Sequence, residues 1–129
     1  MANLSWIPRA LGIATALYGA AVAVRPALMA RPTGLVTSTG EPARGVAVLT
    51  RSIGVRDLAT GLAMAVAPAG TPLRTAIAVR VTADVADAVG FGTGLPDAEA
   101  RRNSAVVAGA WAGLCALSAL AAGKPGRGR

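Results

Sequence analysis

Four long apolar stretches, separated by segments rich in proline, glycine and charge, dominate the pattern of the chain. All eight prolines fall at the edges of these stretches or between them, and proline is tolerated in the first turn of a helix and in connections but not in helix interiors. The pattern predicts an all-α fold, a bundle of four transmembrane helices with short connections, as a single domain over residues 1–123. The predicted helices cover about 7–24, 45–67, 73–91 and 104–122, followed by a basic, disordered tail at 124–129.

The first and last stretches differ in how clearly they predict a membrane span. The apolar core at 11–24 is short, so a cleaved signal peptide is an alternative for it. Against that alternative, Arg25 and Pro26 follow directly, where a small-residue cleavage site is expected. A short helical turn at 26–30 is expected at the interface. The stretch at 104–122 is the one uncharged span of suitable length.

Composition supports the membrane interpretation. Hydrophobic residues make up 53% of the chain and charged residues 15%, whereas soluble domains are roughly 25% charged. Aromatic residues amount to only 3%, so a soluble core would lack the large side chains that usually supply most buried area. A soluble helical bundle rich in alanine, glycine and valine is the alternative.

The net charge of +7 does not point to nucleic acid, because of where the charges lie. The apolar stretches hold three arginines and three aspartates, which cancel, and the surplus lies in connections and termini. Basic residues beside apolar spans suit anionic lipid headgroups, whereas a nucleic-acid surface needs a basic face with interleaved aromatic residues. We expect the lipid bilayer as partner, a multi-pass location in the cell membrane and no nucleic-acid binding. The basic tail favours cytoplasmic termini.

The chain has no histidine and a single cysteine, Cys115. This excludes imidazole acid–base chemistry, histidine metal sites and an internal disulfide. Cys115 lies in an apolar run, where a thiol acting as a small buried hydrophobic side chain is expected rather than a reactive one.

The first two stretches share a weak internal similarity. Residues 9–26 align without gaps onto residues 51–68 at a constant offset of 42, and an arginine, two glycines and the final proline coincide. The alignment matches Arg51 with an interfacial arginine and places Thr15 where the second stretch has Asp57. Duplication of a helical unit is one interpretation, in which Arg51 reaches the interface. Chance agreement in a chain rich in alanine and glycine is the other.

Small residues recur at helical spacing. The last stretch contains Gly109-x-x-x-Gly113, and the first contains similar pairs such as Gly12 and Ala16. In lipid, small residues let helix backbones approach closely. We interpret these pairs as packing within the chain, with a homo-oligomer seam through Gly109 and Gly113 as the second option.

The third stretch carries three charges on one helical face. Arg80 and Asp84 are four residues apart, and Asp84 and Asp87 are three apart, which places all three side by side. The brief link at 67–72 predicts that the second and third helices are antiparallel neighbours.

The second stretch holds the adjacent pair Arg56–Asp57 near its middle. Across an antiparallel hairpin centred near residue 70, residues whose numbers sum to about 140 face each other. Arg56 then lies level with Asp84, and Asp57 lies about one turn from Arg80. Arg51 comes close to the level of the remaining aspartate. We therefore expect a neutral, interlocked Arg/Asp network between the second and third helices.

Such a network has a structural and a functional interpretation. A charge at the bilayer centre costs roughly 2.5–3.5 kcal/mol, so a buried network must either fix helix register or form a site. As a site, it offers Asp57, Asp84 and Asp87 as candidate acid–base groups, and it offers arginine forks to a phosphate, a carboxylate or a polar headgroup. The candidate ligand-binding arginines are Arg51, Arg56 and Arg80. Asp84-x-x-Asp87 lacks the second acidic motif of magnesium sites, so neither a metal nor a cofactor is predicted.

The run GVRDL at residues 54–58, followed one helix later by Asp84 and Asp87, resembles a family of small four-helix integral membrane proteins of bacteria and fungi. That family is catalogued as a domain of unknown function, and more loosely the chain is similar to the DoxX-like group. The resemblance covers roughly residues 7–122. It implies a four-helix membrane protein and brings no activity, substrate or catalytic residue.

Three functions are consistent with the sequence. The first is a small polytopic membrane protein, an accessory or ligand-binding component with a buried Arg/Asp network, which could take a hydrophobic small molecule. The second is a membrane-embedded enzyme of the cyclase or isomerase type, using an aspartate as acid or base on a hydrophobic or isoprenoid metabolite. The third is a small proton- or ion-coupled transporter. A cavity against Asp84 would favour a site, and a solid bundle would favour a structural network.

Overall fold

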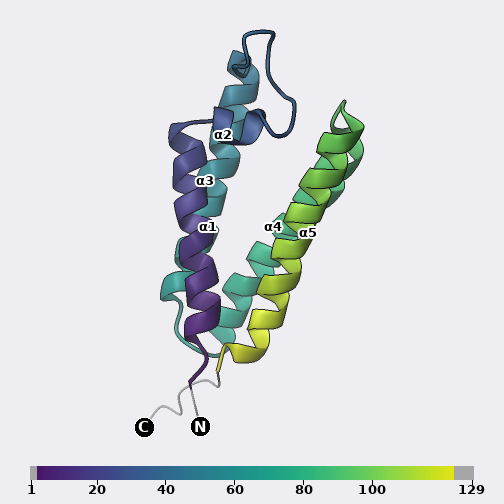
Figure 1. Ribbon diagram of the computed structural model, residues 1–129. Helices are drawn as coiled ribbons and strands as arrows, with labels where there is room; N and C mark the ends of the chain where they lie inside the picture. Colours follow the sequence, from purple (N-terminus) through teal and green to yellow (C-terminus); the bar gives the residue numbers. More distant parts are fainter. Residues whose placement is uncertain (1–2, 124–129) are drawn as a thin grey trace.

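The computed structural model describes residues 3–123 and is helical throughout its regular elements (Figure 1). The elements are α1 (Trp6–Val24), α2 (Ala27–Ala30), α3 (Arg44–Val66), α4 (Thr71–Gly94) and α5 (Ala98–Ser118), which a 3-10 turn at Ala119–Ala121 follows. The all-α prediction is confirmed, and the short turn expected at 26–30 is α2. The basic tail predicted at 124–129 lies outside the described residues.

Prolines and capping residues set the helix limits. Gly70 is the N-cap of α4, with a φ of 94° that favours glycine, and the helix has proline in its first turn. The α5 helix begins six residues before the predicted start at 104. Asp97 caps it by accepting a hydrogen bond from the backbone nitrogen of Ala100 at 2.8 Å, and Glu99 lies in its first turn. The sequence prediction took these charged residues as a connection, although they are signals of a helix start.

The four long helices form two antiparallel pairs, α1 with α3 and α4 with α5 (Figure 1). The α3 and α4 helices are antiparallel neighbours, as the brief link predicted, but each packs more extensively against its other partner. The two pairs meet near the end of the molecule where α1 begins and α5 ends, and they diverge toward the other end, where α2 lies. A buried cluster closes the converging end, made by Met64, Leu73, Ile77, Cys115 and Ala122.

Four glycines bring the backbones of α1 and α3 into contact. A Cβ added to Gly12 would lie 2.6 Å from the carbonyl oxygen of Gly61, and a Cβ added to Gly19 would lie 2.5 Å from that of Gly54. No side chain larger than hydrogen fits at these positions, so the close approach depends on glycine. The packing predicted for the small residues of the first stretch is confirmed here. In contrast, Gly109 has no atom within 4 Å of an added Cβ.

The same four glycines are the ones that coincide in the internal repeat. Gly12 and Gly19 of α1 align with Gly54 and Gly61 of α3, yet Gly12 packs against Gly61 and Gly19 against Gly54. This crossed pairing is what a local two-fold axis between two equivalent antiparallel helices produces. The arrangement therefore gives the sequence similarity a structural counterpart.

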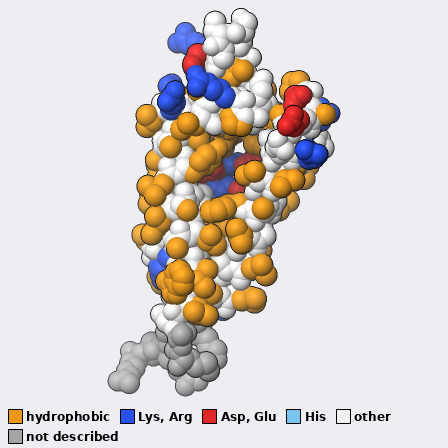
Figure 2. All heavy atoms as spheres, in the orientation of Figure 1, with side chains coloured by type: hydrophobic (Ala, Val, Ile, Leu, Met, Phe, Trp, Pro, Cys, Tyr) orange, Lys and Arg blue, Asp and Glu red, His pale blue; other side chains and the backbone are white. Residues whose placement is uncertain are grey.

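The face shown in Figure 2 is mostly apolar, and apart from the hollow its charged side chains gather mainly near one end. All four long helices expose large hydrophobic side chains, including Leu17, Val24, Leu49, Val66, Val79, Val89, Val107 and Leu117. Two segments are long and apolar enough to cross a membrane, Trp6–Val24 and Ala98–Ala121. The α3 and α4 helices each carry four charged residues, which lower their hydropathy.

Candidate functional site

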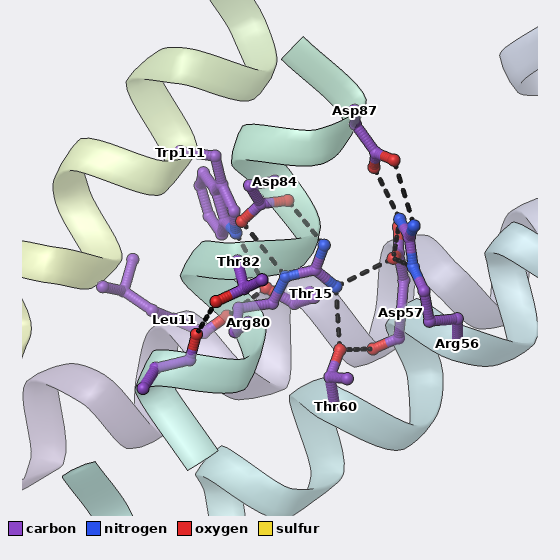
Figure 3. Close-up of polar contacts among 11 residues, drawn as sticks. Leu11, Thr15, Arg56, Asp57, Thr60, Arg80, Thr82, Asp84, Asp87 and Trp111 are labelled. Atoms are coloured by element: carbon purple, nitrogen blue, oxygen red, sulfur yellow. Dashed lines mark hydrogen bonds and ion pairs between the residues drawn. The ribbon is translucent and has the colours of Figure 1, made fainter. Parts of the chain in front are cut away.

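Arg80 lies at the centre of the network, and only 1% of its side chain is exposed. Its Nε and Nη2 donate to the two carboxylate oxygens of Asp84, one turn along α4, at 3.1 and 2.5 Å. Its Nη1 donates to Asp57 Oδ1 and to Thr60 Oγ1 on α3, both at 2.8 Å. All three guanidinium nitrogens are therefore engaged, and they join α4 to α3 (Figure 3).

Arg56 makes the second connection between the two helices. Its Nη1 and Nη2 donate to the two oxygens of Asp87 at 3.0 and 2.5 Å, a bidentate arrangement that fixes geometry as well as charge. Its Nε and Nη2 also donate to Asp57 Oδ1 at 3.2 and 2.9 Å. Asp57 thus lies between the two arginines, and all of these hydrogen bonds reach its Oδ1.

The predicted Arg/Asp network between these two helices is confirmed, but the partner of Arg56 differs from the prediction. Arg56 pairs with Asp87 rather than with Asp84 at its own level, because Arg80 engages both oxygens of Asp84 from one turn away. Asp57 pairs with Arg80, as the one-turn offset predicted.

The expected neutrality fails because Arg51 is exposed and forms no ion pair with the described residues. Two guanidinium groups face three carboxylates, so the network has a formal charge of −1. Arg51 is exposed on α3, and its reach to the membrane interface stays a prediction. Of the three candidate ligand-binding arginines, only Arg56 and Arg80 lie at this site.

A cavity of about 560 Å³ opens between the two helix pairs, and the network forms part of its wall. Figure 2 shows the hollow with the charged side chains inside it, surrounded by hydrophobic ones. Asp57, Arg80, Asp84 and Asp87 line it, whereas Arg56 is not among the lining residues. The three candidate acid–base carboxylates therefore share one cavity. Its volume falls in the range of small-molecule sites in proteins.

Aromatic residues are concentrated at this cavity. The chain has four of them, and Tyr18, Phe91 and Trp111 all line the cavity. The indole Nε1 of Trp111 donates to Thr15 Oγ1 at 2.9 Å, and that hydroxyl donates to the carbonyl oxygen of Leu11 at 2.8 Å. These bonds hold the Trp111 ring from α1 although the residue belongs to α5 (Figure 3).

Sequence reasoning missed the aromatic residues of the site. Tyr18, Phe91 and Trp111 come from three helices, and no spacing along the chain relates them. Their scarcity was visible in the composition, and it could have marked each of them as a candidate. Thr15 was found only as the counterpart of Asp57 in the internal repeat, and both line the cavity.

The other candidate features lie apart from the cavity. Residues 3–123 contain no group of three or more acidic or cysteine side chains arranged to hold a metal ion. Cys115 is buried in the cluster at the converging end, as predicted. Gly109 and Gly113 face open space, so the expectation that they pack within the chain is wrong.

Comparison of the chain with models of known protein families, with curated proteins and with solved structures finds no match. The function of the protein is therefore inferred from the cavity and from the side chains that line it.

Proposed function

We propose that all four long helices cross the lipid bilayer. Large apolar residues of α3 and α4, such as Leu49 and Val79, are exposed on the outside, while the charged residues at the middle of both helices form the buried network. The α3 helix has 23 residues and the α4 helix has 24, and at 1.5 Å per residue each reaches about 35 Å, enough for a hydrocarbon core of about 30 Å. Low hydropathy then reflects an internal polar network, which is where charges are tolerated in membrane proteins.

Labelling of single cysteines from each side of the membrane tests this topology. In a Cys115→Ala background, Ser38→Cys before α3 and Pro96→Cys before α5 should react from one side. Ala69→Cys, between α3 and α4, should react only from the other side. If Ala69→Cys and Ser38→Cys react from the same side, α3 does not cross the membrane and the four-span proposal fails.

Within that bundle, we propose that the cavity binds a hydrophobic small molecule that carries a polar group. The observation that carries this proposal is an apolar cavity with a buried ionic network in its wall. A network that served only to fix helix register would be covered by packed side chains. Here Asp57, Asp84 and Asp87 instead contact open space, so a ligand can reach them.

Filling the cavity tests ligand binding. Ala108 lines the cavity, and Ala110 lies on the exposed face of the same helix. Ala108→Phe should remove a hydrophobic molecule that co-purifies with the protein from membranes, detected by mass spectrometry of an organic extract. Ala110→Phe is the matched control and should retain that molecule. If both variants retain it equally, the molecule binds elsewhere and the proposal loses its support.

A membrane-embedded enzyme of the cyclase or isomerase type is the second candidate. One observation favours it. Among the described residues, no hydrogen bond reaches Oδ2 of Asp57, while both oxygens of Asp84 and of Asp87 are engaged. Asp57 is then the carboxylate best placed to exchange a proton with a ligand in the cavity.

Neutral substitutions separate this enzyme from a structural network. Asp57→Asn, Asp84→Asn and Asp87→Asn keep the shape of each side chain. In an enzyme, Asp57→Asn abolishes turnover of an isoprenoid substrate while the yield of folded protein in detergent is retained. If all three substitutions abolish folding, the network is structural and the enzyme hypothesis is contradicted.

A further inference from the structure

We propose that the cavity selects an organic cation, a hydrophobic body that carries an ammonium or similar charged group. This inference rests on the proposed ligand-binding function and names the chemical class of the ligand. Two independent features of the cavity carry it: the sign of the charge on its wall and the aromatic residues that face it.

The wall of the cavity carries an excess of negative charge. Its charged lining consists of three aspartates and one arginine, a formal charge of −2. Arg56, which does not line the cavity, reduces the charge of the whole network to −1. The remaining lining side chains are uncharged. In a site of low dielectric constant, a ligand of charge +1 balances this excess, whereas an anion adds to it.

The arginines offer little to an anion. Both nitrogen forks are already engaged by carboxylates, since Arg80 holds Asp84 and Arg56 holds Asp87. An anionic headgroup would have to displace one of these internal pairs. The expectation that the arginines bind a phosphate or a carboxylate is therefore less favoured than binding of a cation at the carboxylates.

The aromatic residues supply the second feature. Three of the four aromatic side chains of the protein line this cavity, on α1, α4 and α5. The faces of aromatic rings attract cations, most strongly for tryptophan, and rings that surround an ammonium group are a recurrent way to bind it. Trp111 is held in place by its hydrogen bond to Thr15, so its ring is positioned before a ligand arrives.

Three probes of one shape and different charge test the proposal. They are (4-bromobenzyl)trimethylammonium, its uncharged carbon isostere 1-bromo-4-neopentylbenzene, and the anion 4-bromobenzylsulfonate. In a Trp6→Phe background, Trp111 is the one tryptophan, and bromine quenches its fluorescence on contact. Trp6 is exposed on α1 and does not line the cavity, so its replacement leaves the site intact.

We expect the cation to quench at concentrations about tenfold or more below those needed for its uncharged isostere. The anion should not quench. Ala108→Phe should abolish quenching by the cation, and Ala110→Phe should not. If the uncharged probe or the anion binds as well as the cation, and Ala108→Phe still blocks that binding, the cavity takes ligands but does not select cations. If Ala108→Phe affects none of the probes, ligand binding itself fails.

Two substitutions test the two features separately. Asp87→Asn removes one negative charge and should weaken binding of the cation about tenfold, with no such loss for the uncharged isostere. Asp97→Asn makes the same change outside the cavity and should have no effect, because Asp97 caps α5 and an asparagine can do the same. Phe91→Leu should weaken binding of the cation several-fold and should change binding of the uncharged isostere little. If Phe91→Leu weakens binding of the cation and of the isostere equally, an aromatic contribution to cation binding is contradicted. This result does not depend on whether the Asp87→Asn variant folds.

Discussion

The contact between α1 and α3 leads to a sharp prediction about Gly54. A Cβ at this position would lie 2.6 Å from the backbone nitrogen of Ala23 and 2.7 Å from the carbonyl oxygen of Gly19. Both obstacles are backbone atoms, so no rotation of a side chain relieves the clash. Gly54→Ala must therefore move the two helices apart.

The size of this movement sets the expected loss of stability. Ordinary contacts begin at 3.4 Å, so a separation of about 0.8 Å (3.4 minus 2.6) is required. A gap of that size forfeits a quarter to a half of each van der Waals contact it opens. Because the helices touch along their length, we expect Gly54→Ala to lower the free energy of unfolding by about 3 kcal/mol, the upper end of overpacking effects.

Equilibrium unfolding in mixed micelles, followed by circular dichroism as the fraction of denaturing detergent rises, measures this loss. Gly109→Ala is the matched control, since an added Cβ there meets nothing within 4 Å. Alanine has the higher helix propensity, so the control should be neutral or more stable by up to about 1 kcal/mol. If the two variants unfold at the same detergent fraction, the glycine contact does not hold α1 against α3.

Three further predictions address polar interactions. Arg80→Leu leaves Asp57 and Asp84 buried without their shared partner and should lower the free energy of unfolding by about 3–5 kcal/mol, measured by the same unfolding titration. Trp111→Phe keeps an aromatic ring but loses the 2.9 Å hydrogen bond to a threonine hydroxyl; it should cost about 1 kcal/mol, and a loss above about 3 kcal/mol would mean that the ring itself moves. Glu41→Gln breaks the exposed 2.5 Å ion pair with Arg31 and should change stability by less than about 1 kcal/mol, with a shrinking difference as salt is added.

The long helices and the existence of the polar network could be predicted from the sequence. Proline positions and apolar stretches predicted the long helices, and the brief link predicted which charged segments would face each other. The partner of Arg56 was beyond this reasoning. Helix periodicity gives the height of a side chain along the helix, but an arginine side chain can reach a full turn in either direction. Which aspartate it binds then depends on which aspartates the other arginines already bind. Arg80 engages Asp84, so Arg56 engages Asp87.

The cavity could not be predicted from the sequence. It exists because the two helix pairs diverge, and the divergence depends on which helices pack most closely. The glycines of α1 and α3 determine this packing, because they allow backbone contact between these two helices and not between α4 and α5. The sequence pattern treated the glycine spacing of α5 as equivalent, yet Gly109 and Gly113 face outward. A spacing of small residues permits close packing but does not say against which neighbour.

One pair of matching positions in the internal alignment faces the cavity from both helices. Under the local two-fold axis that relates α1 to α3, Thr15 is equivalent to Asp57, and both line the cavity. Equivalent positions of two antiparallel helices reach the same space only when they lie near that axis, midway between the two glycine contacts. The two copies then differ in chemistry at this point. Thr15 of α1 holds Trp111 in place, whereas Asp57 of α3 binds both arginines and supplies the third carboxylate, which gives the network its excess negative charge. A neutral residue at this position of α3, like the threonine of α1, would leave two arginines against two aspartates. The excess negative charge of the network therefore depends on Asp57, at one of the positions where the two copies differ.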